Sequence, residues 1–240
     1  MRRNIGVGKG ENILEQIKTR CLANLDRRST NRWPKGGGTV NNPCDYKPQV
    51  QSDFIGKARF YAGLLDKAVQ MSPEGPLKFL FVGKPGTGKT ELGHYMQRKL
   101  GVTKWSLHKY NGSQCKIEAV DKLAEQLAYT DYFSPWRMVW IEEADAIPSV
   151  SAQIRLLTVI DETPKKVVWV LTSNCAVKDF ETRFQSRFQV LEFPPVPQAD
   201  IEAFLKRWPL RENILKQIAT FACGNVRQAL LDAQTQLCIP

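Results

Sequence analysis

The sequence predicts an α/β protein with a parallel sheet of five strands flanked by helices, followed by a small helical domain. From about residue 46, short apolar runs alternate with segments in which apolar residues recur every three or four positions, as in βα repeats. A glycine-rich segment, 83–90, lies between one such run and one such helical segment. The run Pro-Pro-Val-Pro at 194–197 ends the alternation, and only helical periodicity follows it.

The strands and helices are expected in a regular order along the chain. Strands are predicted over residues 77–82, 104–110, 138–142, 167–172 and 189–193. Helices are predicted between them near 88–100, 114–128, 151–161 and 178–186, and beyond the prolines over 198–207, 211–222 and 225–237. We therefore expect an α/β domain over residues 46–195 and a helical domain over 196–240.

The first 45 residues form a basic arm that differs in composition from the rest. The 34 Lys and Arg residues of the chain exceed its 24 Asp and Glu residues by 10, and residues 1–50 hold 10 basic and 4 acidic residues. This excess suggests an anionic partner, with nucleic acid first among the candidates. The segment 27–38, with Arg, Trp and Gly, could grip a nucleic-acid backbone or serve as a solubilising linker. An amphipathic helix over 13–25 could contact another subunit or partner, or pack on the body of the protein.

Composition argues for a globular protein inside the cell. Hydrophobic residues make up 42% of the 240 residues and charged residues 24%, which is ordinary for a globular domain. The longest apolar run, 167–171, is too short to span a bilayer, and the N-terminus lacks a signal-peptide core. Six scattered cysteines and two histidines form no zinc-ligand pattern, so we interpret the cysteines as reduced thiols. The expected location is the cytoplasm, nucleoid or nucleus, without a membrane partner.

The segment 83–90, Gly-Lys-Pro-Gly-Thr-Gly-Lys-Thr, fits the pattern G-x-x-x-x-G-K-[ST] of a phosphate-binding loop. The N–H groups of such a loop and the N-terminus of the following helix bind phosphate oxygens. Lys89 is expected to reach the β- and γ-phosphates of ATP, and the Thr90 hydroxyl to bind Mg²⁺. The alternative, a chance glycine-rich turn, does not account for the strand before it and the helix after it.

Two carboxylates follow the third predicted strand. Glu142 is expected to hold the Mg²⁺ shell through a water molecule, and Glu143 to polarise the attacking water. The alternative is a charged helix start after a strand. Asp is usual at the first of these two positions. The extra methylene group of Glu142 moves its carboxylate by about a bond length, which affects the geometry of the metal site and the turnover rate.

Together these residues resemble the AAA+ ATPases, and among them the clamp-loader small subunits, over roughly residues 46–237. The matching segments are Tyr46-Lys47-Pro48 with 53–57, 111–114 (Asn-Gly-Ser-Gln), 152–157, Ser173-Asn174, 186–188 (Ser-Arg-Phe) and 224–230. The resemblance implies an AAA+ fold in which the C-terminal helices form a lid. It also implies an ATP site made by Ile55, Gly56, Lys84, Pro85, Gly86, Thr87, Gly88, Lys89, Thr90, Glu91 and Arg227.

The resemblance further implies four roles outside the loop. Asn174 would orient the attacking water, Arg187 would be an arginine finger supplied to a neighbouring subunit, and Arg227 would sense the γ-phosphate from the lid. Asn111 would switch the orientation of Glu143, although an Asn-Gly turn explains that residue almost as well. Asn174 could instead end a strand, and Arg187 and Arg227 could be surface charges. An arginine supplied in trans raises such rates by about 10³- to 10⁵-fold.

Two features favour action on DNA over threading of a protein. Only residues 162–166 separate a predicted helix from the fourth strand, which leaves no room for the long hairpin of helicase relatives, and the turn 110–114 lacks an aromatic pore loop. By position in clamp-loader relatives, Ser113, Gln114, Lys116 and Arg155 are candidates for DNA-backbone contacts. A solvated charged face is the alternative for each. Trp136, Trp140 and Trp169 are expected to pack in the core.

The predicted function is that of an oligomeric, Mg²⁺-dependent ATPase that loads or remodels a partner on DNA in replication, recombination or transposition. The sequence stops after the lid, where clamp-loader subunits carry a helical collar, so assembly as a ring, spiral or filament would depend on ATP and on the Arg187 face. The alternatives are a remodeller that acts on a protein complex without DNA, and a scaffold that binds ATP but hydrolyses it slowly. The protein partner is not identified.

Overall fold

The computed structural model describes residues 42–71, 75–129, 134–177 and 182–238. The predicted helix over 13–25 and the arginine-rich segment 27–38 lie outside these residues, as does most of the predicted arm over 1–45. Within the described residues, no helix is long and apolar enough to cross a bilayer.

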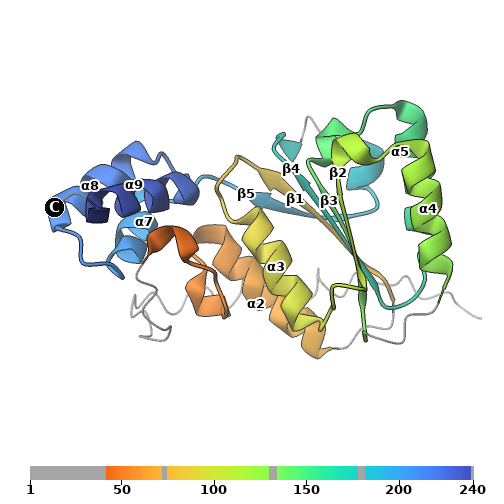
Figure 1. Ribbon diagram of the computed structural model, residues 1–240, viewed down its shortest axis with the longest axis horizontal. Coiled ribbons are helices and arrows are strands. Elements are labelled where there is room, and N and C mark those ends of the chain that lie inside the picture. The colour runs from red at the N-terminus through yellow and green to blue at the C-terminus, as the bar shows by residue number, and fades with distance from the viewer. Residues whose placement is uncertain (1–41, 72–74, 130–133, 178–181, 239–240) are drawn as a thin grey trace, which may run out of the picture.

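Five parallel strands form one sheet at the centre of the protein (Figure 1). The strands are β1 (Leu77–Gly83), β2 (Leu107–Asn111), β3 (Arg137–Glu142), β4 (Val167–Ser173) and β5 (Gln189–Phe193), in the spatial order β2-β3-β4-β1-β5. The predicted parallel five-stranded sheet is confirmed. Because all strands run in one direction, the residues that follow β1, β3 and β4 meet at the carboxyl edge of the sheet, where ligands bind in open α/β sheets.

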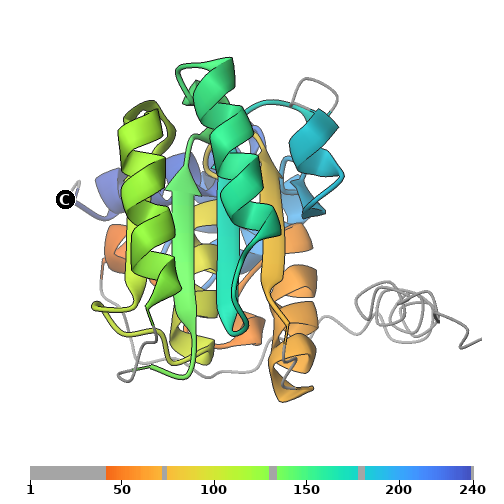
Figure 2. The same cartoon turned by 90° about the vertical axis from the view of Figure 1, so that its right-hand side faces the viewer.

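Helices cover both faces of the sheet. Figure 2 shows α4 (Ile117–Ala128) and α5 (Val150–Asp161) on one face, while α2 (Gly56–Gln70) and α3 (Lys89–Lys99) lie on the other. The remaining α-helices are α6 (Thr182–Gln185), α7 (Gln198–Leu205), α8 (Glu212–Phe221) and α9 (Val226–Cys238). Short 3₁₀ helices are η1 (Pro43–Asp45), η2 (Gln51–Asp53), η3 (Gly112–Gln114) and η4 (Ala144–Ala146).

The two faces of β3 and β4 form two separate cores, because successive side chains of a strand point to opposite faces. Val139 and Trp169 pack under α4 and α5. Trp140 packs under α2 and α3, where its ring leaves no space for a side chain at Gly93: a Cβ there would lie 2.7 Å from the indole. Trp136, Trp140 and Trp169 are 7%, 0% and 0% exposed, so the prediction that they belong to the core is confirmed.

Helices α7, α8 and α9 pack around a third apolar cluster at one end of the molecule (Figure 1). Its members include Ile201, Phe204, Trp208 and Leu215, and Ile55 and Val196 join it from outside the three helices. The cluster is compatible with the helical lid expected from the sequence. The domain boundaries at residues 45/46 and 195/196 stay predictions.

Three elements differ from the prediction: one helix was not predicted, and two elements have other bounds. Helix α2 was not predicted, although Ala58, Tyr61, Leu65 and Ala68 are spaced as on one helix face. Strand β2 begins at Leu107 rather than 104, because residues 103–106 form a turn closed by the bond from Ser106 N–H to the Thr103 carbonyl, 3.2 Å. The predicted helix 114–128 begins only at Ile117, as α4, because Lys116 has an extended backbone that separates it from η3.

Of the predicted helix 178–186, the structure describes α6 and the residue after it, while 178–181 lie outside the described residues. The remaining predicted strands and helices are confirmed to within about two residues at each end, which is the usual uncertainty of an element boundary.

Candidate functional site

The glycine-rich loop connects β1 to α3 at the carboxyl edge of the sheet. Gly86 and Gly88 have φ values of +75° and +96°, which residues with a Cβ rarely adopt. The Thr87 hydroxyl donates a hydrogen bond to the Lys84 carbonyl, 2.9 Å, which closes the loop on itself. Gly88 is the N-cap of α3, so the first N–H groups of that helix open toward the loop. This is the concave arrangement of N–H groups that binds phosphate.

Lys89 lies in the centre of the loop with only 7% of its surface exposed. Its ammonium group donates to the carbonyls of Gly83 and Lys84, at 2.5 and 2.9 Å, and to Asn174 Oδ1 at 3.1 Å. Burial, together with the charge of Arg227, lowers the pKa of Lys89 to about 8. The structure therefore brings three predicted site residues together: Lys89 from α3, Asn174 from the end of β4, and Arg227 from α9.

Helix α9 rests directly on the loop. The Val226 N–H donates to the Gly86 carbonyl, 2.9 Å, across more than a hundred residues of sequence. A Cβ at Gly86 would lie 1.7 Å from the side-chain oxygen of Asn225, so a larger residue there would displace Asn225 at the start of α9. Arg227 follows at the first turn of this helix, which explains its electrostatic effect on Lys89.

The other predicted ATP-binding residues flank the loop. Lys84 and Pro85 are exposed at its tip, and Thr90 and Glu91 form the first turn of α3. Ile55 is buried in the lid cluster, and Gly56, with a φ of +56°, packs against Val196. Because a Cβ at Gly88 would lie 3.3 Å from the Ala58 Cβ, the start of α2 lies beside the loop, and Ile55 and Gly56 with it.

The two carboxylates that follow β3 are held in different ways. Glu143 adopts a left-handed backbone with φ of 53°, a conformation that is sparsely populated outside glycine and is found most often at functional sites. Its Oε2 accepts a hydrogen bond from the Asn111 amide, 3.0 Å. Glu142 instead makes an ion pair with Lys109 of β2, with 3.1 Å between Nζ and Oε2.

Thr90 and Glu142 lie at the same edge and on the same face of the sheet. The His94 ring of α3 packs on Trp140 of β3, with 4.7 Å between ring centroids. Thr90 lies one helical turn before His94, and Glu142 lies two residues after Trp140, so both project toward the carboxyl edge. A hydroxyl and a carboxylate oxygen suit Mg²⁺, which keeps several waters and needs few protein ligands. The described residues contain no group of three or more His, Cys, Asp or Glu side chains that could hold a metal ion.

The predicted DNA-contacting residues start next to Asn111. The Ser113 hydroxyl and N–H both donate to Asn111 Oδ1, at 2.7 and 3.0 Å, and Gln114 accepts from the Asn111 N–H at 3.0 Å. Ser113, Gln114 and Lys116 are exposed, and Lys116 is the N-cap of α4. Arg155 of α5 is half-buried and its Nε lies 2.6 Å from Asp121 of α4, so it joins the two helices.

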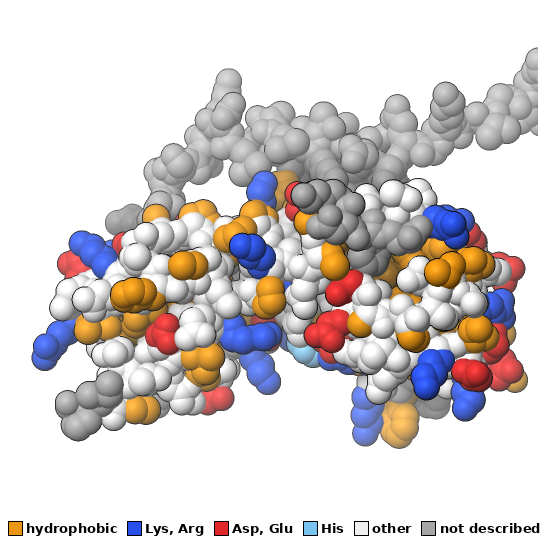
Figure 3. Space-filling model, turned by 90° about the horizontal axis from the view of Figure 1, so that it is seen from above, with side chains coloured by type: hydrophobic (Ala, Val, Ile, Leu, Met, Phe, Trp, Pro, Cys, Tyr) orange, Lys and Arg blue, Asp and Glu red, His pale blue; other side chains and the backbone are white. Residues whose placement is uncertain are grey.

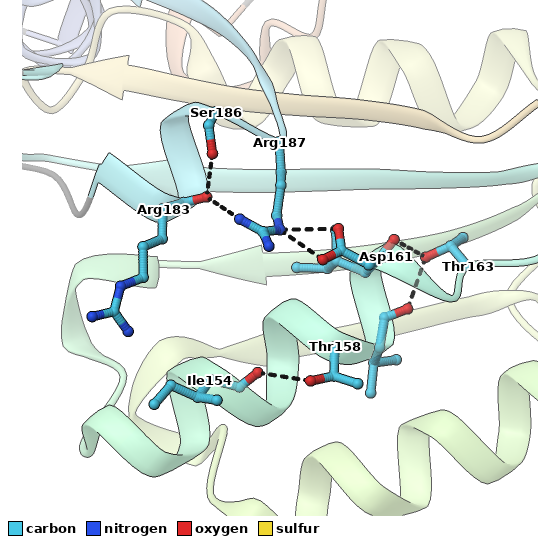
Figure 4. A network of polar contacts seen from close by, with 9 residues as sticks. Ile154, Thr158, Asp161, Thr163, Arg183, Ser186 and Arg187 are labelled. Atoms are coloured by element: carbon cyan, nitrogen blue, oxygen red, sulfur yellow. Dashed lines mark hydrogen bonds and ion pairs between the residues drawn. The ribbon is translucent and has the colours of Figure 1, made fainter.

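Arg187 lies far from the loop of its own chain. It precedes β5, whose first residue Gln189 is in register with Phe79 near the start of β1, whereas the loop follows the other end of β1. Four residues of strand separate Phe79 from Gly83, about 13 Å at 3.3 Å per residue. Arg187 Nε donates to both carboxylate oxygens of Asp161, at 2.9 Å each, and Nη1 donates to the Arg183 carbonyl at 3.1 Å (Figure 4).

Sequence reasoning missed three of these partners. Lys109, Asp145 and Asp161 are the partners of Glu142, Asn174 and Arg187. Asp145 Oδ1 accepts from the Asn174 N–H at 3.4 Å and counteracts the lowering of the Lys89 pKa. The sequence did contain a signal for Lys109. It lies two residues before Asn111 on the same strand, so both side chains project to the same face of the sheet.

Comparisons with known proteins relate this part of the chain to ATPases. Residues 79–196, which contain the loop, both carboxylates, Asn174 and Arg187, match the family described as "ATPase family associated with various cellular activities (AAA)". The probable replication factor C subunit 5 of Dictyostelium discoideum is 27% identical over 164 residues, which are 63% of this chain and 47% of that protein. The replication factor C small subunit of Archaeoglobus fulgidus is 32% identical over 204 residues, 77% of this chain and 60% of that protein.

The fold is also similar to that of a solved bacterial protein. A mutant of RuvB from Thermotoga maritima superposes with a TM-score of 0.62 over 78% of this chain and 64% of that chain, at 19% identity, which supports the fold alone. The chain spans about half to three fifths of the length of the two curated relatives named above. From the strand order, the geometry of the loop and the family match together, we conclude that residues 79–196 form a domain of the AAA type.

Proposed function

We propose that the protein is an oligomeric, Mg²⁺-dependent ATPase whose ATP state is coupled to DNA, on which it loads or remodels a partner protein. The observation that carries this proposal is a continuous set of hydrogen bonds from Ser113 through Asn111 to Glu143. It joins an exposed helix start, a candidate for contact with a DNA backbone, to the carboxylate that would activate water. The similarity to replication factor C subunits supports the DNA part of the proposal.

In the proposed reaction, the loop N–H groups and Lys89 bind the phosphates of ATP. The Lys89 ammonium exchanges its three present acceptors, among them the Gly83 and Lys84 carbonyls, for phosphate oxygens. Asn174 is then free to orient water, and Glu143 accepts the proton of the water that attacks the γ-phosphate. Mg²⁺, held by Thr90 and by Glu142 directly or through water, would neutralise charge on the phosphate oxygens.

DNA would act on this reaction by releasing Glu143. While Asn111 donates to Glu143, that carboxylate is held toward β2. A phosphate bound at Ser113 and Lys116 would draw Ser113 from Asn111 Oδ1 and rearrange the Asn111 amide. Phosphate contacts of this kind are independent of sequence and weaken as salt increases.

Arg187 would complete the site of a neighbouring subunit. Its place at the amino edge of the sheet, opposite to the loop, supports a role outside the site of its own chain. Within the described residues, Nη2 of Arg187 has no hydrogen bond, so one edge of the guanidinium remains available to a neighbour's γ-phosphate.

The second candidate is an ATP-dependent scaffold with slow turnover, and the Lys109–Glu142 ion pair favours it. A carboxylate that is already paired with a cation binds metal less readily. A remodeller that acts on a protein complex without DNA is the third candidate, and it shares the ATP site of the first.

Phosphate release from ATP, measured with and without duplex or single-stranded DNA at low salt, tests the proposal. Stimulation by DNA is expected, together with Mg²⁺ dependence. Turnover that is steady but indifferent to DNA would favour the remodeller, and stable ATP binding without turnover would favour the scaffold. Absence of DNA binding even at low salt would contradict the leading proposal.

The DNA contact is tested by Lys116→Gln against Lys122→Gln, a matched exposed lysine of the same helix. The logarithm of the DNA-binding constant is plotted against the logarithm of the salt concentration. Because Lys116→Gln loses one phosphate contact, the magnitude of its slope should be smaller by about 1, whereas Lys122→Gln should keep the slope of the unmodified chain. Equal slopes for both variants and the unmodified chain would remove Lys116 from the DNA-binding surface.

A further inference from the structure

Lys109 forms an ion pair with Glu142, the carboxylate that would bind the metal in the proposed site. Its Nζ lies 3.1 Å from Glu142 Oε2 and 4.3 Å from the centroid of the Trp140 ring. Lys109 and Glu142 come from neighbouring strands: Lys109 is in register with Trp140, and Asn111 is in register with Glu142. The lysine therefore reaches diagonally along the sheet toward its carboxyl edge, with its ammonium group over a fully buried indole.

The surroundings of the pair fix the lysine in this position. Trp140 is held between Gly93, where even a Cβ would approach within 2.7 Å, and the His94 ring at 4.7 Å. A cation over the face of such a ring is attracted by its π electrons, which adds to the attraction of the carboxylate. With side-chain exposures of 37% and 30%, Lys109 and Glu142 are only partly screened by water.

We propose that Lys109 is a resident cation that competes with Mg²⁺ for Glu142 and so sets the metal concentration at which the site is filled. This inference rests on the proposed function, because it takes Glu142 as a metal ligand. Lys109 engages Oε2, and among the described residues no hydrogen bond engages Oε1. The divalent cation must either displace the ammonium group or share the carboxylate with it, and both cost affinity through repulsion of like charges.

The test is the Mg²⁺ dependence of ATP binding in a chain that cannot consume ATP. Binding of a fluorescent ATP analogue is titrated with Mg²⁺ in the Glu143→Gln background, with and without Lys109→Met. Methionine keeps an unbranched side chain of similar length beside Trp140 and removes the charged ammonium group. Because the ion pair is partly exposed, we expect the Mg²⁺ concentration at half-saturation to fall by about two- to fivefold.

Lys104→Met is the matched control. Lys104 also lies over a tryptophan, with 4.7 Å between its Nζ and the Trp105 ring centroid, and its removal changes net charge equally. The Mg²⁺ midpoint should not move in this variant. A second comparison in a Glu142→Gln background should abolish the effect of Lys109→Met, because the two residues then no longer interact.

The results separate this inference from the proposed function. If the unmodified site requires Mg²⁺ and Lys109→Met leaves the midpoint unchanged or raises it, the inference is wrong while the metal site stands. If ATP binding does not depend on Mg²⁺ at all, the metal site is wrong and the inference falls with it. Far-ultraviolet circular dichroism and the thermal unfolding midpoint establish that each variant is folded, and Lys109→Gln serves as a second charge-removing variant.

Discussion

Glu143 has a strained backbone and an amide partner, which together keep it in one orientation. Its φ of 53° and its hydrogen bond from Asn111 are both local features of the carboxyl edge. The motif at 142–143 could be predicted from sequence because it is contiguous. The Asn111 contact required knowledge that β2 and β3 are neighbours, although the resemblance of 111–114 to a family motif pointed to it.

Loss of the Asn111 amide should release Glu143 without removing it. For Asn111→Ala, we expect ATP turnover without DNA to rise by about two- to tenfold and stimulation by DNA to shrink, because a hydrogen bond to a charged group is lost. Steady-state phosphate release with and without DNA measures both. A folded variant with an unchanged basal rate and unchanged stimulation would show that Asn111 serves only the turn.

The lowered pKa of Lys89 makes ATP affinity depend on pH. Burial and Arg227 hold the pKa near 8 rather than the ordinary 10.5, whereas bound phosphate favours the ammonium form. Between about pH 8 and 10.5 the free site must take up a proton to bind ATP, so affinity should fall by up to about tenfold per pH unit as pH rises.

Calorimetry at pH 9 in two buffers of different ionisation enthalpy measures the proton uptake associated with Lys89. The residual binding of Lys89→Arg should lack this uptake, because arginine stays charged in this range. An affinity that is flat between pH 7.5 and 9.5 would show that Lys89 is not the group that binds phosphate.

Other pairs could not be predicted at the residue scale. Asp161 and Arg187 are 26 positions apart, and Lys109 and Glu142 are separated by the whole of α4. Such pairs depend on strand order and on how a helix ends against a sheet, and a single sequence specifies neither. The loop residues could be predicted because eight consecutive positions contain the whole motif.

At the scale of elements, the start of α9 and the loop form one contact surface. The Val226 N–H donates a hydrogen bond to the Gly86 carbonyl, and the Asn225 side chain lies over Gly86. A side chain at position 86 would therefore clash with Asn225 in its present position. The three helices could be predicted from periodicity. Their docking on the loop could not, because it depends on Gly86, which stands at a variable position of the phosphate-loop pattern.

Gly86→Ala should therefore separate α9 from the loop. A Cβ 1.7 Å from Asn225 and a φ of +75° are both unfavourable, and we expect ATP affinity to fall at least about tenfold and stability by about 1–2 kcal/mol. Equilibrium ATP binding and thermal unfolding measure the two effects. Gly75→Ala, where a Cβ would meet no atom within 4 Å, should change neither; similar effects in both variants would contradict the account.

Among elements, α2 was missed because its residues include two glycines and the preceding segment resembles a binding motif. The strands were predicted more accurately because they are buried on both faces and therefore continuously apolar. Their order in the sheet was not predicted, since apolar runs alone do not specify which strands are neighbours.

On the part of the surface that Figure 3 shows in colour, the Lys and Arg side chains are interspersed with Asp and Glu. The DNA proposal therefore rests on local placement at the starts of α4 and η3, not on overall charge. The basic arm of the sequence lies outside the described residues and remains a separate prediction.

Two opposite edges of the sheet carry the parts of one proposed site: the loop and Glu143 at the carboxyl edge, Arg187 at the amino edge. We therefore predict that the protein needs a neighbouring subunit for full activity. A mixture of two inactive variants, Arg187→Ala and Glu143→Gln, tests this arrangement because each supplies what the other lacks.

Phosphate release by the equimolar mixture is the most direct measurement. If subunits mix freely, half of the sites keep Glu143 and half of their neighbours supply Arg187, so the mixture should recover about a quarter of the wild-type rate. Each variant alone should be nearly inactive while it still binds ATP. Full activity of Arg187→Ala alone, or a mixture no more active than its components, would contradict a site completed by an adjacent subunit.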